Sequence, residues 1–249
     1  MKTRQAAVSA ALAALCGPLF SHTAAAGPAD YVHSPLVEYG EREIELKAGR
    51  ARLGDGTHGH ALKLGFGTGL KPWWFTEVSV GFVGASGEST KYEALEWENI
   101  FQLTERGRHA LEAGLLFEIE RPRERAEGYE LKYGPLLQMD AGQVQLNGNA
   151  LFERHVRADA PSDTQLVYEW QAKYRLRREL EFGVQGFGEL GKWDHWSPHD
   201  EQSHSLGPAV FGKLALGGRQ GLRYDAGILL AASPAAPDHT LRLRLEYEF

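Results

Sequence analysis

The 249-residue sequence predicts an all-β protein: a closed, up-and-down antiparallel transmembrane β-barrel of about twelve strands. Three observations favour this fold class. Apolar and polar residues alternate along most of the chain. The alternating segments are longer than the roughly five to six residues usual in soluble sheets. Long polar connections between these segments alternate with short ones. Since no apolar run approaches the ~20 residues of a spanning helix, a membrane crossing would fall to the strands.

The N-terminus has the layout of a secretory signal peptide. Lys2 and Arg4 precede an apolar stretch, and Ala24 and Ala26 are the small residues before an expected cut at Gly27. We therefore divide the chain into a signal peptide (1–26), a periplasmic N-terminal segment (27–37) and an outer-membrane β-barrel (38–249).

Cysteine content and charge exclude two further classes of protein. The single cysteine, Cys16, lies inside the predicted signal peptide, and Leu15 before it is too large for a lipoprotein processing site, so the mature chain has no disulfide scaffold. Removing Lys2 and Arg4 from 27 basic residues leaves 25 against 33 acidic residues, a net charge of about −8. A nucleic-acid partner is therefore not expected.

The strands are read from the period-two pattern, which sends alternate side chains to opposite faces. In the segment 165–177, for example, Leu166, Tyr168 and Trp170 alternate with polar residues. The twelve expected strands lie near residues 38–53, 60–70, 73–84, 91–104, 109–121, 128–139, 143–156, 165–177, 180–191, 205–217, 222–232 and 240–249.

The connections supply a second test of the fold. Those after odd-numbered strands are long and polar, as in RPRERAEG, whereas those after even-numbered strands are short, as in DAG. An outer-membrane barrel with both termini in the periplasm predicts this alternation. A large soluble β-sandwich is the alternative; it explains the period but not the strand length, the even count or the paired loop lengths.

The chain ends in TLRLRLEYEF, a strand with regularly spaced apolar residues, an aromatic residue at Tyr247 and a terminal Phe249. This end resembles the assembly signal of bacterial outer-membrane β-barrel proteins, and the whole layout resembles the small twelve-stranded porin-like group. The resemblance implies a location in the outer membrane, contact with its lipid and recognition by the barrel-assembly machinery. It identifies no particular protein.

If the apolar face meets lipid, the polar face points into the lumen. We count seventeen carboxylates and nine bases on that inward phase. Phe187, between two glycines, shares the phase and fits either a constriction or a strand bulge. The candidate lumen-lining residues are Glu96, Glu98, Glu112, Glu118, Glu153, Glu169, Lys173, Arg175, Arg242 and Arg244.

Two interpretations of this lumen stay open. Unpaired carboxylates can line a wet channel that favours cationic or neutral polar solutes, or acids and bases can cross-link a mostly closed interior. Twelve strands give a width between filled barrels and open porins. The first interpretation makes the protein a transport pore; the second makes it a plugged structural or surface-binding barrel. The oligomeric state is left open.

No cofactor and no enzymatic activity are expected. An outer-membrane lipid hydrolase needs a serine within reach of a histidine and an orienting group. His155 falls on an inward phase, but no serine lies near it on the same or the adjacent strand body, and there is no G-x-S-x-G motif.

A metal site is a further hypothesis. The longest expected loop, KWDHWSPHDEQSHS, contains His195, His199 and His204, and imidazole is a good ligand for zinc or copper. Exposed loops also collect such residues without binding a metal, so a solvated surface loop is the alternative.

Overall fold

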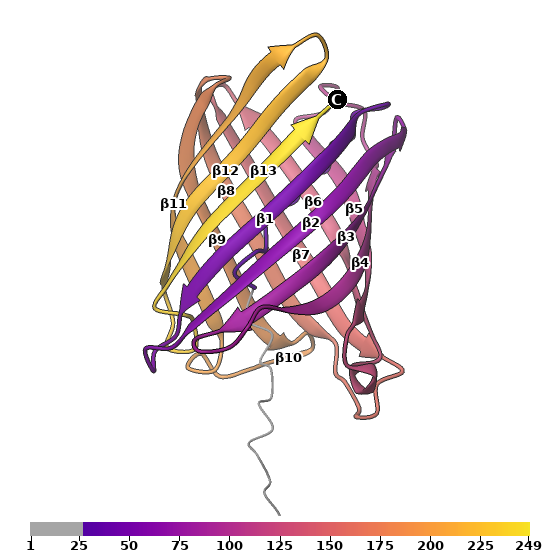
Figure 1. The fold of residues 1–249 in the computed structure, drawn as a ribbon. Coiled ribbons are helices and arrows are strands. Elements are labelled where there is room, and N and C mark those ends of the chain that lie inside the picture. Colours follow the sequence, from indigo (N-terminus) through magenta and orange to yellow (C-terminus); the bar gives the residue numbers. More distant parts are fainter. Residues whose placement is uncertain (1–26) are drawn as a thin grey trace, which may run out of the picture.

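The computed structural model describes residues 27–249, and the predicted signal peptide lies outside these residues. Twelve long strands form a barrel, and a two-residue strand and one short 3-10 turn are added to it (Figure 1). The elements are β1 Arg42–Arg52, β2 His58–Lys71, β3 Trp74–Ala85, β4 Lys91–Gln102, β5 Leu111–Pro122, η1 Arg125–Glu127, β6 Tyr129–Ala141, β7 Val144–Val156, β8 Gln165–Arg177, β9 Leu180–Lys192, β10 His195–Trp196, β11 Ser203–Gly217, β12 Gln220–Ala231 and β13 His239–Glu248.

Every long strand pairs antiparallel with its sequence neighbours, and β13 closes the barrel on β1. In that closing pair Ile44 faces Tyr247 and Leu46 faces Leu245. The additional strand β10 pairs only with the end of β9, so β9 still reaches both β8 and β11. The predicted fold class, a closed up-and-down barrel of twelve long strands, is confirmed.

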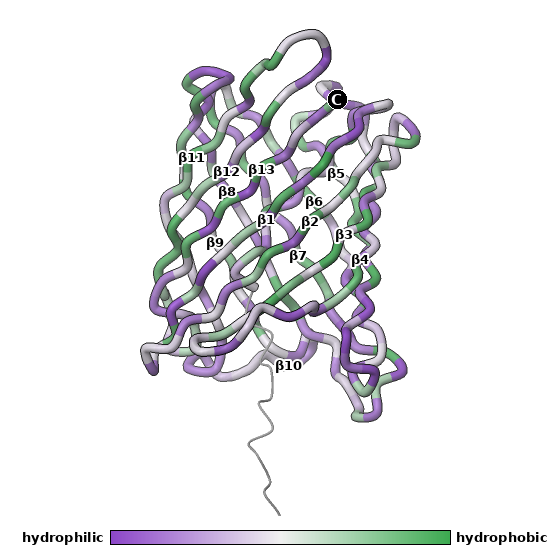
Figure 2. The backbone as a smooth tube through the Cα atoms, in the orientation of Figure 1, coloured by the Kyte–Doolittle hydropathy of each residue, from purple (hydrophilic) through white to green (hydrophobic). Residues whose placement is uncertain are grey.

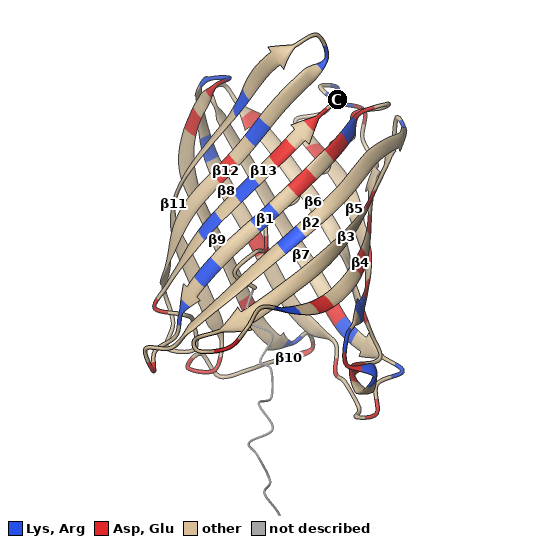
Figure 3. Ribbon diagram, viewed as in Figure 1, with Lys and Arg blue, Asp and Glu red and all other residues tan. Residues whose placement is uncertain are grey.

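The barrel is apolar outside and polar inside, because period-two alternation places one set of side chains on each face. Outward Phe66 and Leu241 are 50% and 51% exposed, whereas Glu45 and Glu246 are each 1% exposed. Figure 2 shows the hydropathy alternating along the strands, and Figure 3 shows the charges repeated along them. This distribution is the reverse of that in a soluble β-sandwich.

The two ends of the barrel differ in their connections. At the turn end, where the C-terminus lies (Figure 1), the hairpins β2–β3, β6–β7, β8–β9 and β11–β12 have two-residue connections. The β4–β5 connection is longer than the expected short turn, and its Gly107 N–H donates to the inward carboxylate of Glu112 at 2.7 Å. At the other end, here called the loop end, every connection between two long strands has five or more residues. Within the described chain no helix is long and apolar enough to cross a bilayer.

Residues 27–41, here called the N-terminal segment, contain no helix or strand. Residues 27–37 lie inside the barrel, and Glu38, Tyr39 and Gly40 are exposed at the turn end. The first strand consequently starts at Arg42 rather than near residue 38. The structure thus corrects the expectation that residues 27–37 lie in the periplasm. Tyr31, Val32 and Val37 are 3%, 6% and 8% exposed. Inward-facing apolar side chains of the wall cover Val32 and Val37, and cationic side chains such as Arg242 cover the ring of Tyr31.

Candidate functional site: the lumen and its N-terminal segment

An apolar cluster within the lumen holds the turn-end half of the N-terminal segment. Val37 packs there against inward residues of four strands, β4 to β7. These inward apolar residues form a row across neighbouring strands that begins on β3. Phe75 on β3 faces Ile100 on β4, which in turn faces Leu116 on β5. The wall partners of Val37 are Ile100, Leu116, Leu136 and Leu151. A wholly water-filled pore would leave these side chains exposed, so the segment is part of the folded interior.

Inward glycines let the backbone of the segment approach the wall. A Cβ atom on Gly49 would lie 1.8 Å from the carbonyl oxygen of Pro28, and one on Gly69 would lie 2.0 Å from that of Glu38. Gly114 lies in the same way beneath Pro35, at 3.0 Å. Glycine is required at the first two positions because any larger residue would collide with main-chain atoms.

His33 joins the segment to two separate strands of the wall, β4 and β8, with three strands between them. Its Nδ1 is 2.5 Å from Glu169 Oε1 on β8, and its Nε2 is 3.2 Å from Glu98 Oε2 on β4. Burial lowers the pKa of His33, but the carboxylates of Glu169 and Glu98 outweigh it and raise the pKa to about 10. His33 is therefore a cation at neutral pH, and each ring N–H donates to a carboxylate.

Tyr31 forms a second attachment through an arginine. The guanidinium of Arg242 lies 4.6 Å from the centre of the Tyr31 ring and 4.1 Å from that of Phe187. Among residues 27–249, Arg242 has no ion pair with a carboxylate, so these aromatic faces are its close partners. Val32 completes the contact by packing on Phe187 and Leu229. Phe187 thus points inward, as its phase predicts, and contacts the segment.

A chain of side-chain amides runs around the wall beside the segment. Hydrogen bonds run from Glu112 on β5 through amides that face one another in register on the neighbouring strands β6 to β9. The last bond, from Gln185 on β9 to Asp225 on β12, passes over β11. The Ser34 hydroxyl donates to this chain at 3.3 Å. The amides are those of Gln138, Asn147, Gln171 and Gln185. Because they bond to one another, they form a neutral belt in the lumen.

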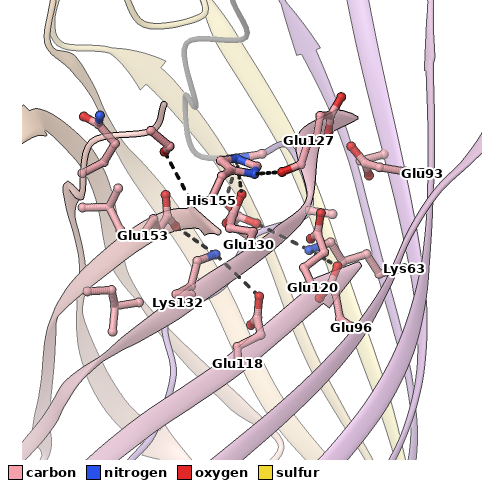
Figure 4. A pocket seen from close by; sticks show the side chains of 18 of the residues that line it. Lys63, Glu93, Glu96, Glu118, Glu120, Glu127, Glu130, Lys132, Glu153 and His155 are labelled. Carbon is pink, nitrogen blue, oxygen red and sulfur yellow. Dashed lines mark hydrogen bonds and ion pairs between the residues drawn. The ribbon is translucent and has the colours of Figure 1, made fainter. Parts of the chain in front are cut away.

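The segment separates two chambers. The loop-end chamber has a volume of about 980 Å³ and is strongly acidic. Figure 4 shows two of its lysines among the carboxylates: Lys63 lies 2.7 Å from Glu96, and Lys132 lies 3.0 Å from Glu153. The lining includes three lysines, Lys47, Lys63 and Lys132, and twelve carboxylates: Asp30, Glu93, Glu96, Glu98, Glu118, Glu120, Glu127, Glu130, Glu153, Asp159, Asp163 and Glu169.

The turn-end chamber is smaller, about 300 Å³, and has the opposite charge balance. Some of its bases are paired, as in Arg223 with Glu246 at 2.9 Å. Its bases are Arg106, Lys173, Arg175, Arg178, Lys213, Arg223 and Arg244, and its acids are Glu38, Glu41, Glu181, Asp225 and Glu246. The lumen is therefore acidic towards the loop end and basic towards the turn end.

The candidate lumen-lining residues fall into three groups. Five carboxylates line the loop-end chamber: Glu96, Glu98, Glu118, Glu153 and Glu169. Three bases line the turn-end chamber: Lys173, Arg175 and Arg244. Two are buried in the wall outside both chambers: Glu112, which bonds to Gln138 and Gly107, and Arg242, which contacts Tyr31.

His155 lies at the rim of the loop-end chamber with a serine nearby. The Ser162 hydroxyl, on the β7–β8 loop, accepts the backbone N–H of His155 at 3.2 Å. The ring has other partners: Nδ1 is 3.1 Å from the carbonyl oxygen of Glu127, and Nε2 is 3.2 Å from Glu130. Since both ring nitrogens are already bonded, this arrangement is not a serine–histidine pair ready for nucleophilic attack.

The histidine-rich loop spreads its three candidate ligands. His195 pairs with Lys192 in the β9–β10 hairpin. The rings of His199 and His204 have centroids 5.9 Å apart, and both nitrogens of His204 already bond, to Tyr168 and Gln202. Within the described chain, none of the compact groups of three potential ligand atoms includes these histidines.

The metal hypothesis for this loop stays a prediction that calorimetry can check. If the loop closes around zinc, titration of the refolded protein should release heat that disappears when His195, His199 and His204 are replaced together by alanine. Equal heats before and after the replacement would contradict it.

Tyr247 and Phe249 lie together at the turn end. Their ring centroids are 5.7 Å apart, Phe249 is 40% exposed, and the Phe249 N–H donates to the carbonyl oxygen of Arg42. Trp73, Trp74 and Phe101 stack at the same end, with centroids 6.2 to 6.3 Å apart. Aromatic side chains at one level are typical of a membrane interface.

Sequence reasoning missed the N-terminal segment, although the strands carry a signal for it. Apolar residues occupy inward positions, such as Ile100, Leu116 and Leu151, where a polar lumen needs none. An apolar residue at a lumen-facing position of a membrane strand indicates that another part of the protein packs against it inside the barrel. The segment itself is short and aperiodic, so nothing within it predicts where it lies.

Comparisons with known proteins agree with this architecture. No protein-family model matches the chain, and no curated protein matches it in sequence. An outer-membrane channel from Pseudomonas putida F1 superposes with a TM-score of 0.61 at 12% identity, covering 88% of this chain and 99% of that one. The NanC porin superposes at 0.56 and 8% identity, covering 83% and 98%. The translocator domain of the autotransporter NalP from Neisseria meningitidis superposes at 0.50 and 13% identity, covering 85% and 89%. The chain therefore has the fold of outer-membrane β-barrel proteins.

Proposed function

We propose that the protein is a channel of the bacterial outer membrane for small polar solutes, and that it favours cationic and neutral solutes over anions. The outward apolar face, the aromatic residues of the turn end and the shared fold support the membrane location. The turn end then faces the periplasm and the loop end faces the medium, as the lengths of the connections require.

The excess of carboxylates in the loop-end chamber carries the proposal. A solute entering from the medium meets twelve carboxylates, three lysines and His33. Each of the three lysines lies within 3.0 Å of a carboxylate, so its charge is largely compensated. Such an entrance attracts cations and repels anions, because low-dielectric walls concentrate the field of charges that line a cleft.

The N-terminal segment favours a second candidate, a closed barrel with a structural or surface-binding role. The segment fills the middle of the lumen, where Tyr31, Val32 and Val37 are almost wholly buried. The two candidates differ in one measurable quantity, the ion current through a single barrel.

Conductance in planar bilayers tests the proposal. We expect discrete steps from the refolded chain of residues 27–249, with a reversal potential that shows cation preference. Replacing Glu127 by glutamine and Asp159 by asparagine, both of which line the loop-end chamber, should lower the potassium-to-chloride permeability ratio about fivefold, since one charge 4 Å from a permeating ion contributes about 1 kcal/mol even in water. Because the other chamber is basic, the current should also differ between the two signs of voltage.

The control replaces Glu88 and Glu105, which lie in exposed connections and pair with Lys91 and Arg108. This variant should keep the permeability ratio of the unmodified protein. If folded barrels give no conductance steps in repeated preparations, the channel is ruled out and the closed barrel is favoured. If steps appear without cation preference, the carboxylates do not set selectivity.

A further inference from the structure

The wall of the lumen bonds to the backbone of the N-terminal segment. The carboxylate of Glu169 accepts the N–H of His33 at 3.0 Å, and the amide of Asn149 donates to the carbonyl oxygen of the same residue at 3.0 Å. Gln102 Oε1 accepts the N–H of Val37 at 2.7 Å. Since nearly every residue carries these main-chain groups, the wall offers contacts that suit a peptide of any sequence.

The segment is held in a mostly extended conformation. Pro28 contacts Gly49, which pairs with Ala61 on β2, and Glu38 contacts Gly69 on the same strand. Eight residues along a strand span roughly 26 Å. Ten residues of the segment cover this distance, against a maximum of about 35 Å for a fully extended chain.

Two side chains add selectivity to the backbone contacts. His33 lies between Glu98 and Glu169, and Tyr31 lies on Arg242. Their wall partners come from β4, β8 and β13, strands that are far apart around the barrel. A ligand must therefore present an aromatic residue and a cationic ring two positions apart to meet all of them.

One end of the segment has no long-range attachment to the wall through its main chain. At the turn end, Gly40 and Glu41 exchange backbone hydrogen bonds with Gly69. At the other end, the N–H of Gly27 bonds within the segment, to Asp30 at 2.6 Å, in the loop-end chamber. If the chain is cut before Gly27, as the sequence predicts, this end is free to leave while residues 40 and 41 stay in place.

We propose that the middle of the lumen is a peptide-binding site and that the N-terminal segment is its tethered, exchangeable ligand. The class of ligand is a mostly extended peptide of about ten residues in which tyrosine and histidine are two positions apart. Exchange makes and breaks non-covalent contacts only, and no covalent bond changes. It concerns binding, so it does not require that the barrel conduct ions.

The proposal can be tested by adding a labelled peptide to a barrel whose own N-terminal segment binds the lumen less tightly. The ligand is a fluorescent peptide of residues 27–38, and the protein is the refolded chain of residues 27–249 with Tyr31→Ala and His33→Ala. We expect a saturable rise in fluorescence anisotropy. The unmodified protein should bind about a hundredfold more weakly, because its tethered segment competes at a millimolar effective concentration.

A disulfide staple supplies the matched control. A Cβ atom on Gly114 would lie 3.0 Å from the Cβ of Pro35, close to the roughly 3.5 to 4.5 Å between the Cβ atoms of a disulfide. Cys16, the one cysteine of the sequence, lies before residue 27. Adding Pro35→Cys and Gly114→Cys to the weakened variant should hold its segment in place. Peptide binding should then be absent in the oxidised protein and return on reduction.

Three results would overturn the proposal. The first is that the weakened variant, shown to be folded by its heat-modifiable mobility on gels, binds no peptide. The second is that it binds a scrambled peptide of the same composition equally well. The third is that oxidation of the stapled variant leaves binding unchanged. None of these results concerns conductance. The channel proposal is tested separately, by the planar-bilayer recordings.

Discussion

Replacing His33 by alanine is expected to destabilise the folded barrel by about 3 kcal/mol, because it leaves two buried carboxylates without their cation. Glu98 on β4 and Glu169 on β8 both lose their ion pair with the segment. The free energy of unfolding in detergent micelles, from urea titrations followed by tryptophan fluorescence, measures the loss.

The effect of this substitution should depend on pH. Since the folded-state pKa of His33 is raised from 6.5 to about 10, its stabilising contribution is complete below pH 6.5 and declines as the pH rises through 10. The difference in unfolding free energy between the unmodified protein and His33→Ala should therefore shrink between these two values. His109→Ala, at an exposed position in the β4–β5 connection, is the control. Equal stability of all three proteins at pH 7 would show that His33 does not hold the segment.

Replacing Phe249 by alanine is expected to reduce the amount of barrel in the outer membrane several-fold while changing the stability of refolded protein by no more than about 0.5 kcal/mol. The ring is 40% exposed and contacts Tyr247, and the backbone hydrogen bond to Arg42 does not require it. Because the ring has so little structural role, a lower yield in the membrane would support its recognition during assembly. Heat-modifiable protein in membrane fractions and urea unfolding give the two quantities.

Trp73→Ala tests whether any exposed aromatic residue at the turn end has the same effect, since Trp73 is 51% exposed. It should leave the yield in the membrane near that of the unmodified protein. If Phe249→Ala accumulates normally, the terminal aromatic residue is not an assembly signal in this protein. If it accumulates poorly and is also unstable after refolding, its role is structural.

The strands could be predicted from the sequence because each reports its own pattern. Along β8, for instance, Tyr168 and Trp170 point outward while Glu169 and Gln171 are 6% and 7% exposed. Such alternation is local: a strand in a membrane barrel meets lipid on one face and the lumen on the other along its whole length. The β10 hairpin was missed because two residues are too few to show a period.

The lumen could be predicted only as a list of residues. The inward phase identifies Glu118 and Arg244 alike as lining residues, but it does not say that one lies in the acidic loop-end chamber and the other in the basic turn-end chamber. That division depends on the stagger between strands, which is set when β13 closes on β1. A sequence pattern records the face of a residue and not its height in the barrel.

By itself, the sequence determined that twelve long strands form a closed barrel with its polar face inward, because that outcome follows from the period and length of each strand separately. Only the tertiary structure decided what fills the barrel. His33 lies 65 residues from Glu98 and 136 from Glu169 along the chain, and no local rule connects them. Contacts between residues so far apart form only after closure brings the strands around a common axis, so the occupant of the lumen is a property of the whole fold.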